Sequence, residues 1–168
     1  VSSQDEADQA IEGRVFIRNV NFDGGGIILH ATYGSKIEGC AFQDSVLDMR
    51  FCLQSLVEGA HFRGNSYHII ADGNWKGANP ANSQSNSTVV KQSRHYSRPA
   101  QKYAVLVKDS SQVLLTNCIY EGHNPIFNVV GEFVNGTNAQ SFYIDMPHFE
   151  NNPTIAAVDI AARGGLYQ

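Results

Sequence analysis

The sequence repeats a six-residue pattern three times at one constant interval, as Ile17-Arg-Asn-Val-Asn-Phe22, Ile37-Glu-Gly-Cys-Ala-Phe42 and Val57-Glu-Gly-Ala-His-Phe62. Each copy begins with an aliphatic residue, carries a small apolar residue at its fourth position and ends on Phe. The pattern returns as Leu115-Thr-Asn-Cys-Ile-Tyr120 and as Ile144-Asp-Met-Pro-His-Phe149. A recurring unit of this length is typical of architectures in which each repeat stacks on its neighbours.

Each copy is followed by a turn and then by a second short apolar stretch, as in Asp23-Gly-Gly-Gly26 before Ile27-Ile-Leu-His30. A repeat this short has room for two or three short strands with their turns, and none for a crossover helix. The remaining solution is a coil in which each repeat of about 20 residues is one turn, with equivalent strands stacked about 4.8 Å apart in parallel sheets. Phe22, Phe42 and Phe62 are then predicted to form a ladder inside the coil.

The stretch from Ser35 to Phe42, written Ser-x-Ile-x-x-Cys-x-Phe, follows Gly26-Ile-Ile-Leu29 and resembles the repeat of right-handed parallel β-helix proteins. These are the pectin-lyase-like superfamily and the related bacteriophage tailspikes and appendages. The resemblance covers most of residues 13–160 and lies in structural positions, so it implies a fold more directly than an activity. We therefore expect an all-β protein with a single right-handed parallel β-helix domain over residues 1–168.

The two ends of such a coil need covering, because unpaired strand edges aggregate. Ser3-Gln-Asp-Glu6 matches a helix capping box, and apolar residues follow on one helical face. We expect a short helix over residues 4–11 within an N-terminal cap, residues 1–13. The last turn, 154–160, has no such cap. Tailspike-like proteins bury these edges by threefold association, so the resemblance implies a homotrimer.

Residues 73–102 interrupt the repeat with a polar, basic stretch, and no acidic residue lies between Asp72 and Asp109. One interpretation is an excursion from a single turn, to which Thr88-Val-Val90 adds a strand. The other is a loop that walls a groove for an anionic sugar chain, because aromatic rings stack on sugars while Lys and Arg pair with carboxylate or sulfate groups. The candidate substrate-binding residues of this stretch are Trp75, Lys76, Arg94, Tyr96 and Arg98.

The strand after each aromatic turn carries ionisable residues on its outward side. The interval of the repeat places Asp48 beside His68 and His30 beside Arg50, on the sheet that commonly carries the active site in the enzymes this fold resembles. His68 or His30 is the candidate catalytic base of a β-elimination, with Asp48 orienting His68 and Arg50 neutralising the carboxylate of a uronic acid. Ordinary solvent-facing pairs between neighbouring strands account for the same pattern.

Three functions stay open at this point. The first is a carbohydrate-binding module of tailspike or appendage type on a virion, which binds and in some forms cleaves a cell-surface polysaccharide, expected to be acidic. The second is a secreted lyase acting on uronic-acid polymers. Glycoside hydrolysis is less favoured, because Asp48 has no second carboxyl group directly above or below it. The third is a purely structural β-helix of a virion or an adhesin.

Composition excludes several other classes. The net charge of −4 makes duplex nucleic acid a poor partner, and no apolar run reaches the length of a membrane span. Three Cys residues rule out a fold held together by many disulfides. Cys40 and Cys118 occupy the small apolar position of the repeat and are expected in the core. No spacing of Cys and His suggests zinc and no Asp/Asn cluster suggests calcium, so no metal or cofactor is expected.

Overall fold

The computed structural model describes residues 4–5, 10–11, 13–64, 67–72, 85–97, 104–108, 110–122, 127–131, 140–151 and 158–162. Every regular element within them is a β-strand, which confirms the all-β prediction. Among these residues, no helix has the length and apolar character needed to cross a membrane.

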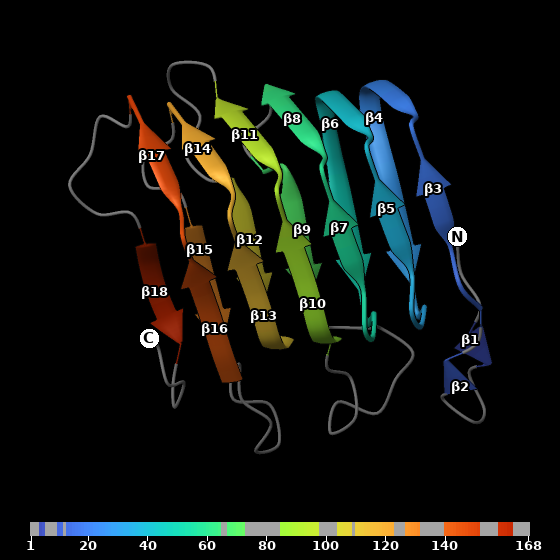
Figure 1. Ribbon diagram of the computed structural model, residues 1–168. Coiled ribbons are helices and arrows are strands. Elements are labelled where there is room, and N and C mark those ends of the chain that lie inside the picture. The colour runs from blue at the N-terminus through green and yellow to red at the C-terminus, as the bar shows by residue number, and fades with distance from the viewer. Residues whose placement is uncertain are drawn as a thin grey trace.

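The strands follow one another in successive passes of the chain, and each pass adds to two parallel sheets (Figure 1). From the first pass onward, the strands are β3 (Phe16–Arg18), β4 (Asn21–His30), β5 (Lys36–Glu38), β6 (Ala41–Arg50), β7 (Leu56–Glu58), β8 (His61–Gly64), β9 (Ile69–Asp72), β10 (Ser85–Lys91), β11 (Arg94–Ser97), β12 (Val105–Lys108), β13 (Ser110–Thr116), β14 (Ile119–Glu121), β15 (Phe127–Gly131), β16 (Gln140–Asp145), β17 (His148–Glu150) and β18 (Val158–Ala162).

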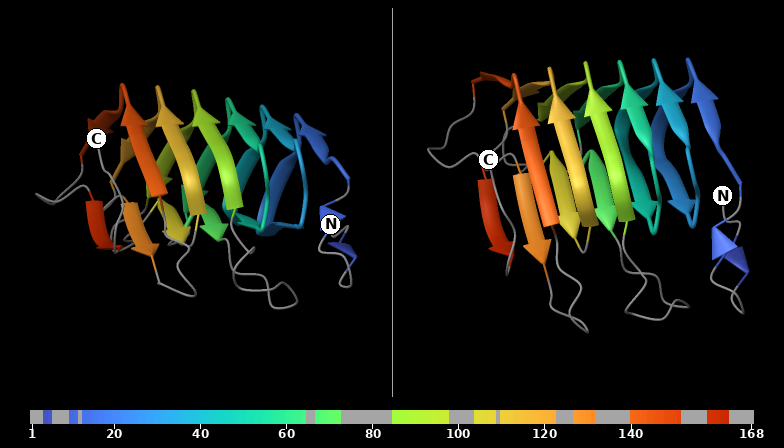
Figure 2. Two further views of the ribbon diagram at one scale, coloured as in Figure 1. Left: turned by 90° about the horizontal axis from the view of Figure 1, so that it is seen from below. Right: turned by 60° about the horizontal axis from the view of Figure 1, so that its bottom comes forward.

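Both sheets are parallel throughout, and each strand pairs with its counterpart in the neighbouring pass. The smaller sheet has six strands in the order β16-β13-β10-β7-β5-β3. The larger sheet has ten strands in the order β17-β14-β11-β8-β6-β9-β12-β15-β18, with β4 paired to β6. It curls back on itself because β6 pairs with β8 through Ala41–Gln43 and with β9 through Leu47–Arg50 (Figure 2). The arrangement is consistent with a parallel β-helix-like fold.

The core between the sheets is built around one column of stacked rings. Phe22, Phe42 and Phe62 stack at centroid distances of 5.0 Å and 4.6 Å, as the sequence repeat predicts. The column continues through His95, whose ring lies 4.9 Å from Phe62, and through Tyr120, 4.9 Å further on. These four inner rings, Phe42 to Tyr120, are buried. In-register pairing therefore turns a sequence repeat into a continuous apolar stack.

The corner between the two sheets is formed by a column of residues that share one backbone conformation. One residue per pass has a φ between 46° and 61°, in the left-handed region that Gly and Asn adopt most readily. These residues are Asn19, Gly39, Gly59, Gln92, Asn117 and Met146. The first five donate their amide hydrogens to carbonyl oxygens of the next pass at 2.9–3.2 Å, so the parallel hydrogen bonding continues around the corner. The amides of these five corner residues are therefore paired as the chain turns.

The N-terminal helix predicted over residues 4–11 is not present. Gln4–Asp5 (β1) and Ala10–Ile11 (β2) are instead two short strands paired antiparallel. A helix as short as the predicted one is not stable without tertiary packing, so a capping box by itself does not secure it. At the other end, residues 154–157 lie outside the described part of the chain. The homotrimer expected from that end stays a prediction.

Part of the predicted insertion belongs to the two parallel sheets. Within residues 73–102, Ser85–Lys91 is strand β10 of the six-stranded sheet and Arg94–Ser97 is strand β11 of the larger one. The expected strand at Thr88–Val90 is thus confirmed. Residues 73–84 and 98–102 lie outside the described residues.

Replacing Phe42 by Ala tests the aromatic column. The change removes a fully buried ring that stacks on both Phe22 and Phe62, so we expect a loss of about 3–5 kcal/mol in the free energy of unfolding. Denaturant unfolding measures it. Phe16→Ala is the matched control, because the Phe16 ring is 68% exposed and its loss should cost under about 0.5 kcal/mol. Equal losses at the two positions would contradict the column.

Candidate functional site

His68 does not lie on the surface that the sequence repeat assigns to it. Its ring is buried in the core, 5.7 Å from the centroid of Phe62 and 5.5 Å from that of His95. The pairing of β6 with β9 is shifted by two positions from the interval of the repeat, so Asp48 pairs with Ile70 rather than with His68. The predicted Asp48–His68 pair is therefore wrong. His68 immediately precedes β9, where the in-and-out alternation of a strand does not hold.

The other three predicted catalytic residues do gather. His30 pairs with Arg50 in register, as expected, and Arg50 pairs on its other side with Asp72. Asp48 lies two residues from Arg50 on the same strand and is 4% exposed. Its Oδ2 accepts hydrogen bonds from Nε of Arg50 at 2.9 Å and from Nη2 at 2.5 Å.

The charges of this group determine what it can do chemically. The carboxylate of Asp48 raises the pKa of Arg50, which is a permanent cation. Burial, and then the positive charge of Arg50, lower the pKa of His30 below its ordinary value of 6.5. His30 is therefore neutral at pH 7 and can accept a proton. Because Nε and Nη2 of Arg50 already donate to Asp48, only Nη1 and the second hydrogen of Nη2 are left for a substrate carboxylate.

The predicted substrate-binding residues divide into two groups. Trp75, Lys76 and Arg98 lie outside the described residues. Arg94 and Tyr96 both lie on β11, where alternation along the strand sends His95 and Ser97 into the core and these two side chains outward. The structure thus brings Arg94 and Tyr96 to one face of the larger sheet, away from His30 and Arg50.

Arg94 and Tyr96 line a depression of about 460 Å³ that runs across β6, β8, β11 and β14; we call it the axial groove. Two rows of side chains form it, and in-register pairing aligns each row across the strands. One row is Gln43, Arg63, Tyr96 and Glu121, continued by Glu150 on β17. The other row is Ala41, His61, Arg94 and Ile119.

An aromatic ring and two cations occupy the middle of the axial groove. The guanidinium of Arg63 lies over the ring of Tyr96, with its carbon 5.6 Å from the centroid, a cation–π contact between neighbouring strands. Tyr96 remains 39% exposed, so much of the ring is open to a ligand. Arg94 is exposed beside it. Within the described residues neither guanidinium makes an ion pair.

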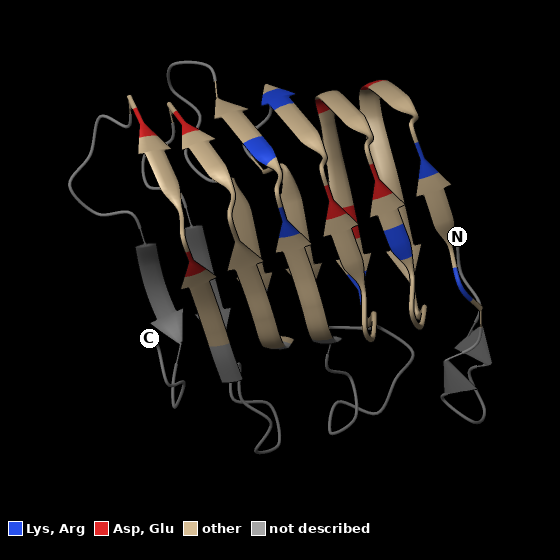
Figure 3. Ribbon diagram, viewed as in Figure 1, with Lys and Arg blue, Asp and Glu red and all other residues tan. Residues whose placement is uncertain are grey.

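The charge changes sign along the axial groove. Lys and Arg colour marks β8 and β11 in Figure 3, whereas Asp and Glu colour marks the ends of β14 and β17. Glu121 and Glu150 pair directly in register on these two strands. Glu121 accepts a hydrogen bond from Asn151 at 3.4 Å, and Glu150 lies 3.6 Å from Nε2 of His148. A ligand along the axis therefore meets cations first and carboxylates next.

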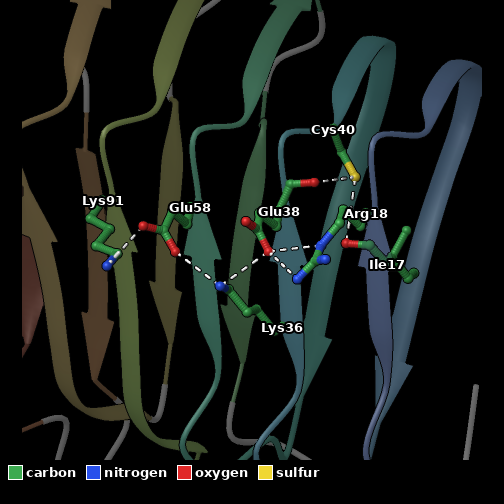
Figure 4. Close-up of polar contacts among 7 residues, drawn as sticks. All are labelled: Ile17, Arg18, Lys36, Glu38, Cys40, Glu58 and Lys91. Carbon is green, nitrogen blue, oxygen red and sulfur yellow. Dashed lines mark hydrogen bonds and ion pairs between the residues drawn. The ribbon is translucent and has the colours of Figure 1, made fainter.

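The six-stranded sheet presents a different kind of surface. Its charged side chains form a continuous series of ion pairs across four strands, which we call the ladder and which Figure 4 draws. Glu38 pairs with Arg18 at 3.0 Å and with Lys36 at 3.1 Å, and Lys36 continues to Glu58 at 3.2 Å. Lys91 completes the ladder 2.9 Å from Glu58. Because each charge already has a partner in the protein, this face offers little to an ionic ligand, unlike the axial groove.

Sequence reasoning missed most of the axial groove. It identified Arg94 and Tyr96 as parts of an insertion, and it left out His61, Arg63 and Glu150. The signal that could have found them is a sixth copy of the repeat, Val90-Lys-Gln-Ser-Arg-His95, in which His replaces the terminal aromatic residue. That copy puts the outward residues flanking His95 into line with those flanking Phe62 and Tyr120.

Among the described residues, no group of three His, Cys, Asp or Glu side chains could hold a metal ion. Comparisons with models of protein families, with curated proteins and with solved structures each return no match for this chain. The function is therefore argued from the geometry of the chain itself.

Lys36 is the central cation of the ladder, and its removal gives a test of the ladder by pH. The hydrogen bond from Lys36 lowers the pKa of Glu38 below the ordinary value of 4.5, and those from Lys91 and then Lys36 lower the pKa of Glu58. Lys36→Ala should raise both pKa values, measured by carboxyl-group NMR titration. Any accompanying loss of stability should be present at pH 7 and vanish as pH falls through these pKa values.

Arg14→Ala is the control for this titration, because its guanidinium lies over Tyr33 rather than beside either glutamate. It should leave both pKa values as they are. Unchanged pKa values in Lys36→Ala would show that the ladder does not persist in solution.

Proposed function

We propose that this chain is a carbohydrate-binding module with a right-handed parallel β-helix fold, of the kind that the pectin-lyase-like and tailspike proteins share. It holds a polysaccharide along the axial groove. The observation that carries the proposal is the exposed ring of Tyr96 between Arg63 and Arg94, in the axial groove. Aromatic faces pack on the apolar faces of sugar rings, and guanidinium groups take their carboxylate or sulfate groups.

The spacing of the strands supports a linear ligand. Strands of neighbouring passes lie about 4.8 Å apart, so equivalent side chains recur at that interval along the axis. A sugar unit in an extended polysaccharide advances by a similar distance. A chain running along the axial groove can therefore place one sugar at each step between neighbouring strands, from β8 and β11 on to β14 and β17. Such a module suits a virion appendage or a secreted protein, with neighbouring subunits covering the coil ends in a homotrimer.

Substitutions on β11 test the binding role. Tyr96→Ala and Arg94→Ala should each weaken binding to an acidic polysaccharide about tenfold, because one removes the stacking surface and the other a charge-assisted hydrogen bond. Affinity electrophoresis in gels containing polygalacturonate, alginate or hyaluronan measures the effect. Arg94→Ala should also flatten the dependence of binding on salt.

Two control variants accompany them. Tyr96→Phe keeps the ring and should keep most of the affinity. Tyr143→Ala makes the same change as Tyr96→Ala on β16 of the six-stranded sheet and should have no effect. If Tyr143→Ala weakens binding as much as Tyr96→Ala, the groove is not the binding site.

A second candidate function is supported by the neutral imidazole of His30 next to Arg50. In a β-elimination, His30 would take the proton at C5 of a uronic acid. The glycosidic oxygen at C4 would leave, forming a C4–C5 double bond, while Arg50 neutralises the carboxylate. This function requires a substrate over β4 and β6 rather than in the axial groove.

Ultraviolet absorbance of the unsaturated product tests this lyase function on the same polymers. His30→Ala should abolish the rise in absorbance. Because the pKa of His30 is lowered, the rate should persist at pH values below 6.5 and fall only when the imidazole is protonated. Asp44→Asn, elsewhere on β6, is a control that should retain the rate. Absence of any absorbance change in the unmodified protein would exclude a lyase of these polymers.

A further inference from the structure

The cationic part of the axial groove is short and has an acidic boundary on each side. Arg63 and Arg94 lie on the adjacent strands β8 and β11. On one side the same row continues with Glu121 and Glu150 on the next two strands. On the other side it continues through Gln43 to Asp23 on β4. The stretch that favours an anion is therefore about two strand spacings long, roughly 10 Å.

The carboxylates at the β14 and β17 end are not neutralised by Lys or Arg within the described residues. Among the described residues their polar contacts are Asn151, which is neutral, and His148 at 3.6 Å. Neither Glu121 nor Glu150 has a Lys or Arg partner in the described part of the chain, whereas Glu38 and Glu58 on the other sheet each have two. A negative group on a ligand over β14 or β17 would thus be repelled, and a sugar hydroxyl there would find hydrogen-bond acceptors.

We infer, on the basis of the proposed function, that the axial groove selects acidic polysaccharides whose charged sugars are separated by neutral ones. One acidic sugar lies over β8 and β11, where Arg63 and Arg94 meet its carboxylate. Neutral sugars follow over β14 and β17, where their hydroxyl groups donate hydrogen bonds to Glu121 and Glu150. A polymer with a carboxylate on every sugar is attracted by the two arginines but repelled by the two glutamates, so its net affinity is lower.

The test varies charge density on one backbone. Polygalacturonate is compared with the same polymer at half and at full methyl esterification. Affinities are measured by calorimetry at neutral pH and low ionic strength. We expect the half-esterified polymer to bind about threefold or more tightly than the fully charged one. Fully esterified galacturonan, which lacks the carboxylate, should bind most weakly of its series.

The double variant Glu121→Gln with Glu150→Gln should remove this preference by raising the affinity for the fully charged polymers. The matched control is Asp5→Asn with Asp145→Asn, which removes the same number of negative charges, from β1 and from β16. It should leave the ratio of affinities as in the unmodified protein. A change of equal size in the control would show that only net charge acts.

The outcomes separate this inference from the proposed function. If Tyr96→Ala weakens binding but the fully charged polymers bind most tightly, the groove binds sugars and the inferred selection is wrong. The same holds if the Glu121/Glu150 double variant keeps the original ratio. If none of the polymers binds the unmodified protein, the proposed function fails and the inference with it.

Discussion

Parallel pairing of each strand with its counterpart in the next pass is the constraint on which the rest of this structure depends. It repeats every side chain position at about 4.8 Å along one axis, so any residue must be compatible with the residues directly above and below it. Inside the coil this produces the ring column from Phe22 to Tyr120. At the corner it produces the column of left-handed residues, whose amides bond to the next pass.

The same constraint gives the two outer faces opposite characters. On the six-stranded sheet, Glu38 and Glu58 are in-register neighbours of like charge, but Lys36 forms an ion pair with both and neutralises them. Along the axial groove, charges of the same sign stand next to each other, first the arginines and then the glutamates. Like charges on adjacent strands destabilise a sheet slightly. Their presence in a groove, beside an exposed aromatic ring, is in keeping with the proposed binding of a ligand there.

Sequence reasoning succeeded where the repeat is uninterrupted and failed where its length changes. The constant interval through Phe22, Phe42 and Phe62 is the true register, and so is that of His30 with Arg50. Between β6 and β9 the interval grows by two positions, which moves His68 from the expected surface into the core. Turn length is set by local backbone geometry that an apolar pattern does not report. The helix predicted at 4–11 failed because a capping motif supplies no tertiary packing.

The sequence by itself determined the all-β class, the direction of stacking and the inward residues, because the spacing of apolar and aromatic side chains encodes which face of a strand is buried. Only the tertiary structure decided which polar residues meet. Arg63, Tyr96 and Glu121 lie far apart in the chain at unequal intervals, and only the sixth copy of the repeat, in which His95 replaces the aromatic residue, relates Tyr96 to the other two in the sequence. They become neighbours because the strands that carry them pair in the same register, although the stretches of sequence between those strands differ in length. A site whose residues come from several passes depends on that pairing between passes, whereas the choice of core residues depends only on the pattern within each pass.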